Sequence, residues 1–231
     1  MVSMCLQGIT AVVFDLDDTL CSERQFVESG FRAVSAYVQE RGITAQALFP
    51  DMWRRFCGGS RGRIFDDSLR AAGVVPDDAL IAELVDVYRS HIPSISLYPD
   101  ARAVLSHFYG RRQLGLLTDG YLQTQHNKVR ALKIEDFFDV LVFTDQMGRR
   151  YWKPDTAGYR RIMAELNVPG AACLYVGDNP GKDFFGANRL GWQTVQICRP
   201  GGIYAGETCE SSDYQADVTI SDLSRLLELV A

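Results

Sequence analysis

The sequence predicts an α/β fold, with a mostly parallel β-sheet and a separate set of inserted helices. Short apolar segments rich in β-branched residues alternate with helical patterns over most of the chain, and one long interval shows helical patterns alone. The chain has 231 residues. Since domains average roughly 150 residues, this length suits one core domain with a smaller inserted domain.

Six short apolar segments are predicted to form buried strands. The first, residues 9–14, is too short for a typical helix and ends in charge at Asp15. The others are residues 114–117, 140–143, 173–176, 194–197 and 218–220. Helical patterns cover residues 102–108, 159–166 and 223–230. Asp155 is the expected N-cap of the second of these helices. Strands that alternate with helices in this way indicate βαβ units and a parallel sheet.

The interval 21–95 interrupts this alternation, because it contains no convincing buried strand. Its helical patterns cover residues 25–40, 45–56 and 77–90, and a glycine-rich basic loop at 58–63 lies between the last two. We therefore expect residues 1–20 and 96–231 to form the α/β core domain. Residues 21–95 are expected to form an inserted helical domain.

The composition excludes several classes of protein. With 47% apolar and 23% charged residues, the chain is neither disordered throughout nor a coiled coil. Its 24 basic and 29 acidic residues give a net charge of −5, which disfavours binding to a nucleic acid polymer. No apolar run approaches the roughly 20 residues needed to span a bilayer, so no membrane partner is expected.

The cysteines indicate a reducing compartment. They lie at positions 5, 21, 57, 173, 198 and 209. No two are separated by two residues, and several lie in apolar segments, so buried free thiols are favoured over disulfides. The N-terminal segment lacks a basic stretch, and its apolar run is interrupted by Asp15, which argues against a signal peptide. A cytoplasmic location is expected.

Polar segments follow or precede the predicted elements at positions where a ligand site forms in such folds. They are DLDDT at 15–19, TDG at 118–120, KPD at 153–155 and GDNPGKD at 177–183. Ligands of open α/β sheets bind beyond the carboxyl ends of the strands. Each segment alone is weak evidence, but the ordered set predicts a shared site.

The charges of this predicted site require a cation. Asp15, Asp17, Asp178 and Asp183 bring as many as four negative charges together, and Lys153 contributes one positive charge. Such a cluster resists full ionisation and repels a phosphate dianion. Carboxylates without nearby histidine or cysteine favour a hard ion, and Mg²⁺ is the expected one.

The four segments resemble the motifs of the haloacid dehalogenase (HAD) superfamily of aspartate-nucleophile phosphohydrolases. FDLDDTL resembles its first motif, LLTDG the second, the lysine of YWKPD the third and GDNPGKD the fourth, and the similarity covers essentially the whole chain. The resemblance implies a Rossmann-like core. It also implies that residues 21–95 are a helical C1 cap, as in subfamily I members such as phosphoglycolate phosphatases and nucleotidases.

The resemblance further implies a two-step reaction. Asp15 is the expected nucleophile that forms an aspartyl phosphate. Asp17 is the expected acid that protonates the leaving alcohol and the base that then activates water. The expected metal ligands are Asp15, Asp178 and the backbone carbonyl of Asp17.

The remaining motif residues are expected to hold the phosphoryl group. Thr118 and the backbone amides of Asp119 and Gly120 are the expected phosphate-binding groups, and Lys153 is expected to neutralise charge between nucleophile and phosphate. Asp183 is expected to orient Lys153 or a metal-bound water.

Other residues near the motifs have more open roles. Arg61 and Arg63 lie in the basic loop of the expected cap and are candidates for substrate contact, with a solvated loop as the alternative. Tyr121 and Gln125 follow the second motif and are further candidates for substrate contact. Asp18 is expected to cap its turn.

The expected activity is magnesium-dependent hydrolysis of a small phosphorylated metabolite. Phosphoglycolate, sugar phosphates and nucleoside monophosphates all remain possible substrates. A phosphomutase is the first alternative. A haloacid dehalogenase is disfavoured by Asp17, and a phospho-receiver domain by the length and the inserted helices. A regulatory protein without catalysis is disfavoured because all the expected reactive positions are filled.

Overall fold

The computed structural model describes residues 6–209 and 211–230. The chain divides into two compact units, one of Met1–Glu23 and Ile95–Ala231 and the other of Arg24–Ser94. We call the first the core unit and the second the helical unit. Their boundaries lie within a few residues of the expected 21–95 insertion.

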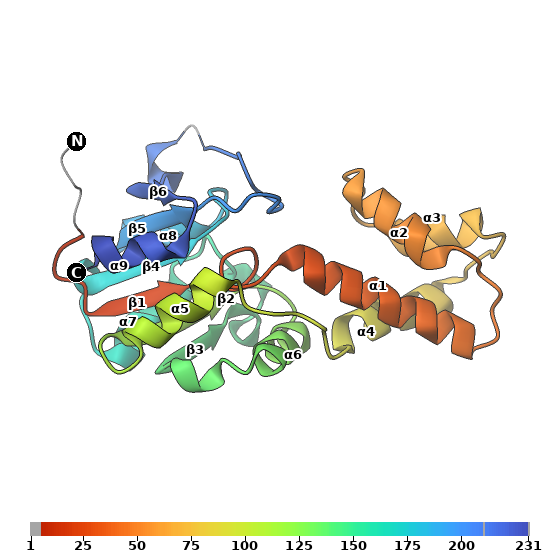
Figure 1. The fold of residues 1–231 in the computed structure, drawn as a ribbon, viewed down its shortest axis with the longest axis horizontal. Coiled ribbons are helices and arrows are strands. Elements are labelled where there is room, and N and C mark those ends of the chain that lie inside the picture. Colours follow the sequence, from red (N-terminus) through yellow and green to blue (C-terminus); the bar gives the residue numbers. More distant parts are fainter. Residues whose placement is uncertain (1–5, 210, 231) are drawn as a thin grey trace. The chain divides into compact units, whose positions relative to one another are not determined.

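The core unit contains a six-stranded parallel sheet with the order β3-β2-β1-β4-β5-β6 (Figure 1). Its strands are β1 (Ala11–Phe14), β2 (Gln113–Thr118), β3 (Val140–Phe143), β4 (Cys173–Gly177), β5 (Gln193–Ile197) and β6 (Val218–Ile220). The predicted α/β fold with a parallel sheet is confirmed. Since β1 lies between β2 and β4, the polar segments that follow these three strands emerge side by side.

Helices cover both faces of this sheet. They are α5 (Pro99–Phe108), α6 (Leu122–Leu132), α7 (Ala157–Leu166), α8 (Asp183–Arg189) and α9 (Leu226–Leu229). Because side chains alternate along a strand, Val12 and Phe14 pack into an apolar cluster with α5, α6 and α9. Ala11 and Val13 pack into a second cluster with α7 and α8. Burial on both faces explains why the first predicted strand is apolar throughout.

Some predicted details of the core unit were wrong. The C-terminal helix is split, because the 3-10 turn Leu223–Arg225 precedes α9. The N-cap of α7 is Thr156 rather than Asp155. The Asp155 carboxylate nevertheless accepts a hydrogen bond from the Ala157 amide at 2.7 Å, so it stabilises the first turn from one position earlier.

The helical unit is built around aromatic side chains. Its helices are α1 (Glu23–Glu40), α2 (Leu48–Cys57), α3 (Ile64–Ala71) and α4 (Asp78–Ser90). The Phe31 ring lies 6.2, 6.0 and 5.8 Å from the rings of Phe56, Phe65 and Tyr88. The sequence analysis missed α3, which follows the basic loop directly. A helix of this length shows only two turns of apolar periodicity, which is a weak signal.

The cysteine prediction was partly wrong. Cys21 and Cys173 are buried and free, whereas Cys57 is free and exposed; Cys198 and Cys209 are free and half-buried. Cys5 lies outside the described residues. Among the helices formed by residues 6–209 and 211–230, none combines the length and apolar character that a membrane span requires.

Candidate active site

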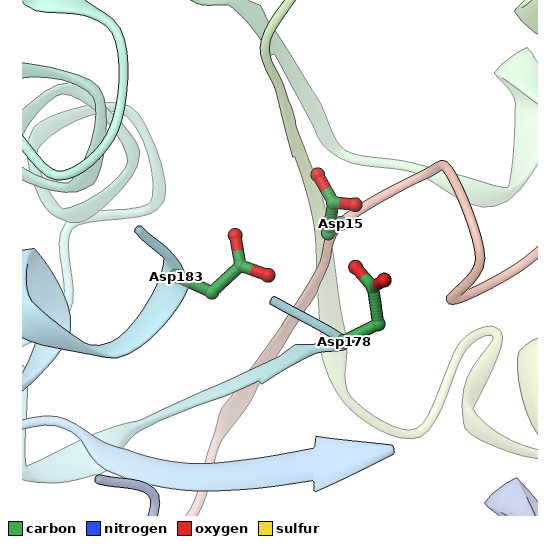
Figure 2. Close-up of side chains that lie close together, drawn as sticks. All are labelled: Asp15, Asp178 and Asp183. Atoms are coloured by element: carbon green, nitrogen blue, oxygen red, sulfur yellow. The ribbon is translucent and has the colours of Figure 1, made fainter. Parts of the chain in front are cut away.

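Three carboxylates converge where the strands of the core unit end. Asp15 follows β1, Asp178 follows β4 and Asp183 begins α8. The Asp15 amide donates to the carbonyl of Val176 at 2.9 Å, which continues the pairing of β1 with β4. Figure 2 shows the three side chains turned toward a common space, and one oxygen from each lies within 4.8 Å of the others. All three residues are buried.

The loop from Gly177 to Asp183 closes on itself and holds the third carboxylate. The Asn179 amide donates to Asp183 Oδ2 at 2.8 Å, and the Asp183 amide donates to the Asn179 carbonyl at 2.9 Å. A Cβ atom at Gly177 would lie 2.6 Å from Asp183 Oδ2. The close packing of this carboxylate against the chain therefore requires glycine at position 177.

Lys153 joins two of these carboxylates. Its Nζ lies 2.5 Å from Asp15 Oδ1 and 2.8 Å from Asp183 Oδ1. It also donates to the hydroxyl of Tyr175 at 2.9 Å. The sequence analysis missed Tyr175, because within the apolar run of β4 it resembles a core aromatic. The only available signal was that a buried tyrosine hydroxyl needs a partner.

Two of the three carboxylates, Asp15 and Asp178, resist ionisation. Burial raises the pKa of Asp15 from 3.8 to about 6, although Lys153 opposes the shift. Burial, Asp183 and Asp15 raise the pKa of Asp178 well above its ordinary value. Burial also acts on Asp183, but Lys153 and Lys182 outweigh it and lower the pKa of that carboxyl. A cation placed among the three oxygens would relieve the repulsion.

The donor set suits a hard divalent cation, because it consists of carboxylate oxygens alone. The expected ligands were Asp15, Asp178 and the backbone carbonyl of Asp17. The structure brings the carboxylates of Asp15 and Asp178 together with that of Asp183, which had been expected in a supporting role.

Asp17 lies among different partners. Lys128 Nζ is 2.7 Å from each oxygen of the Asp17 carboxylate, and Gln125 Nε2 donates to its Oδ2 at 3.0 Å. Burial would raise the pKa of Asp17, but Lys128 and Gln125 lower it below its ordinary value. The expectation that Lys153 alone supplies positive charge to the four aspartates was therefore wrong, because Lys128 pairs with Asp17.

Helix α6 supplies both partners of Asp17. Gln125 and Lys128 are three positions apart, which places them on one face of the helix, and both are buried. The start of α6 is held by Asp145, whose Oδ2 accepts a hydrogen bond from the Leu122 amide at 3.0 Å. Gln125 had been named as a candidate for substrate contact, whereas Lys128 was missed. The signal for Lys128 was a polar residue at a helical position that faces the core.

The residues of the second motif lie beside this network. Gln125 Nε2 donates to Thr118 Oγ1 at 2.6 Å. Asp119 Oδ1 accepts from the Thr144 hydroxyl at 2.7 Å and from the Lys153 amide at 3.1 Å, which ties the second motif to the third. Gly120 has φ 123°, a conformation that favours glycine.

Lys182, which lies in the fourth motif and had no expected role, adds a further cation. Its Nζ lies 3.7 Å from Asp119 Oδ2. Burial opposes charge at this amine, but Asp15 and Asp183 raise its pKa above the ordinary value. Positive charge at the site therefore comes from Lys128 and Lys182 as well as from Lys153.

Asp18 and Arg199 hold the loop that carries the first motif. Asp18 accepts hydrogen bonds from the amides of Glu23 and Ile203, at 2.9 and 2.7 Å. Arg199 donates to the Thr19 carbonyl at 2.8 Å and pairs with Asp100 at 2.7 Å. These contacts agree with a structural role for Asp18.

The two candidate arginines of the helical unit make contacts within that unit. Arg61 Nη1 donates to the carbonyls of Ser60 and Phe56, at 2.8 and 3.1 Å. Arg63 Nη2 lies 3.5 Å from Asp66 Oδ1, and both arginines are exposed. These contacts are those of a solvated loop, and a substrate contact by either residue stays a prediction.

Comparison with known proteins places this geometry in context. The family of haloacid dehalogenase-like hydrolases matches residues 9–191. A glyceraldehyde 3-phosphate phosphatase from Methanopyrus kandleri is 30% identical, over 96% of this chain and 97% of its own. A phosphoserine phosphatase from Thermus thermophilus is 28% identical, over 85% of this chain and 79% of its own.

Solved structures share the fold. A 2-haloacid dehalogenase from Pseudomonas syringae matches with a TM-score of 0.66 and 24% identity, over 96% of this chain and 97% of its own. The HAD-hydrolase YfnB from Bacillus subtilis matches with a TM-score of 0.69 and 17% identity, over 97% and 99% of the two chains. At such identities the likeness concerns the fold alone.

Proposed function

We propose that this chain, which belongs to the family of haloacid dehalogenase-like hydrolases, is a magnesium-dependent phosphatase for a small phosphorylated metabolite. The observation that carries the proposal is the convergence of Asp15, Asp178 and Asp183 beside Lys153. The names of the relatives from Methanopyrus kandleri and Thermus thermophilus support the same class of substrate.

Asp15 is the proposed nucleophile. Its carboxylate oxygen forms a bond to phosphorus while the bond from phosphorus to the alcohol oxygen breaks, and water then cleaves the aspartyl phosphate and restores the carboxylate. Lys153, 2.5 Å from Asp15, offsets the negative charge of the two groups as they meet. Asp183 supports this role by holding Lys153 at 2.8 Å.

Asp17 is the proposed acid and base. It gives a proton to the leaving alcohol in the first step and takes one from water in the second. The ion pair with Lys128 favours the carboxylate form, which the second step requires. Phosphate esters with good leaving groups need no proton in the first step, so we expect them to depend least on Asp17 as the acid.

The remaining motif residues have proposed binding roles. Asp15, Asp178 and the backbone carbonyl of Asp17 are the proposed ligands of Mg²⁺, which when bound would neutralise phosphate charge and polarise its oxygens. Thr118 and the amides of Asp119 and Gly120 are the proposed phosphoryl-binding groups.

The helical unit is the proposed cap, and Arg61 and Arg63 are its proposed substrate contacts. Phosphoglycolate, sugar phosphates and nucleoside monophosphates belong in the substrate panel beside phosphoserine and glyceraldehyde 3-phosphate. If the arginines bind substrate, changing both to alanine raises KM for the best metabolite and leaves KM for p-nitrophenyl phosphate nearly unchanged.

The cysteines among the described residues are free, which supports a cytoplasmic location.

The test is phosphate release by the purified protein from p-nitrophenyl phosphate and from this panel, with MgCl₂ and with EDTA. We expect release that requires Mg²⁺ and that disappears in Asp15→Asn. Failure to release phosphate from every compound would reject the proposal. Conversion of a sugar phosphate into its isomer, without release of phosphate, would favour a phosphomutase instead.

A further inference from the structure

We propose that Lys128 and Gln125 are positioning residues, which hold the Asp17 carboxylate in the orientation from which it exchanges protons with the leaving alcohol and with water. This inference rests on the proposed phosphatase activity and adds a device to it. Neither residue belongs to the four motifs that suggested the site.

The contacts leave the Asp17 carboxylate little freedom to rotate. Lys128 Nζ binds both oxygens at 2.7 Å, and Gln125 Nε2 donates to Oδ2 at 3.0 Å. The Lys128 side chain is only 5% exposed, whereas that of Asp17 is 21% exposed. The Asp17 carboxylate is thus held by buried side chains and remains partly exposed to solvent. A group that exchanges protons with substrate requires such exposure.

Gln125 also couples Asp17 to the expected phosphate-binding loop. The same amide nitrogen that donates to Asp17 donates to Thr118 Oγ1 at 2.6 Å. A Cβ atom at Gly120 would lie 3.1 Å from Gln125 Cδ, so this side chain packs against the loop. One residue therefore sets the position of the acid and base group relative to the loop that is proposed to hold phosphorus.

Helix α6 is a rigid platform for the two side chains. Val129 and Leu132 pack into the apolar cluster that also contains Val12 and Phe14, and Asp145 accepts a hydrogen bond from the first turn of the helix. Functional groups gain precision when they are supported by a packed helix rather than by a loop.

Stability alone does not account for a lysine at this position. Burying an ion pair costs desolvation that its mutual attraction often fails to offset, and a pair of apolar residues of similar volume is frequently as stable. The contact is made to the motif aspartate that is proposed to present an oxygen first to the leaving alcohol and then to water. A role in orienting that carboxylate explains both the burial and the choice of partner.

The leaving group supplies a readout that a structural role would not change. The ratio kcat/KM reports the steps up to departure of the alcohol. Nitrophenolate departs without a proton, whereas the alcohol of O-phosphoserine or glyceraldehyde 3-phosphate needs one. In Lys128→Met and Gln125→Met we expect kcat/KM for the better of these alkyl esters to fall about 10- to 100-fold. For p-nitrophenyl phosphate the ratio should fall only a few-fold.

The second step gives an independent readout. Because Asp17 also serves as the base that activates water, kcat for p-nitrophenyl phosphate should fall in Lys128→Met. A burst of nitrophenol should appear as the phosphorylated enzyme accumulates. Lys128→Arg, which keeps the charge, should restore part of the activity toward the alkyl ester.

A double-mutant cycle tests whether Lys128 acts through Asp17. In an Asp17→Asn background, Lys128→Met should cause no further loss with the alkyl ester. The matched control is Thr194→Val in β5. This change removes a buried hydroxyl whose oxygen lies 3.1 Å from Asp217 Oδ2 and 3.2 Å from Asn188 Oδ1. It should leave the ratio between the two substrates unchanged.

Equal losses for both esters in the position-128 and position-125 variants, or additive losses in the cycle, would overturn the inference while leaving the phosphatase activity intact. If Lys128→Met fails to fold, Gln125→Met and Lys128→Arg decide the question through the same substrate ratio. A wild-type protein that hydrolyses neither ester would overturn the proposed function, and this inference with it.

Discussion

Two buried lysines lie near the ends of the central strands, and the aspartates beside them differ in the direction of their pKa shifts. Lys153 is shared between Asp15 and Asp183, whereas Lys128 binds both oxygens of Asp17. Burial and crowding raise the pKa of Asp15 to about 6, despite Lys153. The pKa of Asp17 is lowered, because Lys128 and Gln125 outweigh its burial.

The difference shows that burial and neighbouring cations compete at each carboxylate: burial outweighs Lys153 at Asp15, whereas Lys128 and Gln125 outweigh burial at Asp17. Around Lys153 the charge is incomplete, so the cluster can accept a divalent cation and a phosphate. Lys128 contacts both oxygens of Asp17, so Asp17 is held as an oriented carboxylate. Two aspartates in one motif thereby acquire different chemistry.

The largest expected effect separates the two aspartates by their roles. Asp15→Asn should lower phosphate release by about 10⁴- to 10⁶-fold, the scale seen when a covalent nucleophile is lost. Asp17→Asn should lower it by about 10²- to 10⁴-fold and trap the aspartyl phosphate, which intact-protein mass spectrometry would detect. Normal turnover by either variant would contradict the assigned roles.

The two lysines should also differ in their contribution to stability. Lys153→Met leaves Asp15 and Asp183 without their shared buried cation and should lower the free energy of unfolding by about 3–5 kcal/mol. Lys128→Met should cost less, about 1–3 kcal/mol, since Asp17 keeps Gln125 and is partly exposed. Urea titration without added metal measures both values. A larger cost at position 128 would reverse the comparison.

Stabilisation by Mg²⁺ should depend on pH in the direction set by Asp15. Its folded-state pKa is raised, so its contribution to the stability of the metal-free protein is complete below pH 4 and is lost as pH rises through about 6. Metal binding needs the carboxylate, so Mg²⁺ should stabilise the protein more at pH 7.5 than at pH 5.

The melting temperature provides the measurement. At a concentration of Mg²⁺ about a hundredfold above Kd, the shift should be about 5–10 °C at the higher pH. Asp178→Asn is the control and should lose most of this shift. A shift that is independent of pH, or that survives in Asp178→Asn, would argue against a metal bound by Asp15 and Asp178.

The smallest expected effect concerns the third partner of Lys153. Tyr175→Phe removes one acceptor while both carboxylates remain, so it should cost about 1 kcal/mol of stability and only a few-fold in kcat. Tyr159→Phe is the matched control, because that buried hydroxyl donates to the Asp183 carbonyl at 2.6 Å. It should cost similar stability and leave kcat unchanged. Equal kcat values in the two variants would remove any role of Tyr175 in holding Lys153.

Most features that depend on neighbours in sequence were predicted, whereas features that depend on contacts between distant parts of the chain were missed. The strands were recognisable because a parallel strand buried on both faces is apolar without interruption, as in β1. Helix α3 was missed because it is short. The motif aspartates were found because each directly follows a strand or begins a helix, whereas Lys128 and Tyr175 were missed because they lie inside regular elements and resemble core or surface residues there.

The amino-acid sequence alone was enough to establish the α/β fold, the acidic segments at the strand ends and the family resemblance, because each depends on neighbours in sequence. Folding decided which cation accompanies which carboxylate: α6 packs so that Lys128 and Gln125 reach Asp17, and β4 brings Tyr175 to Lys153. Ionic interactions depend on distances through space and on burial, and both quantities exist only once helices and strands have packed together.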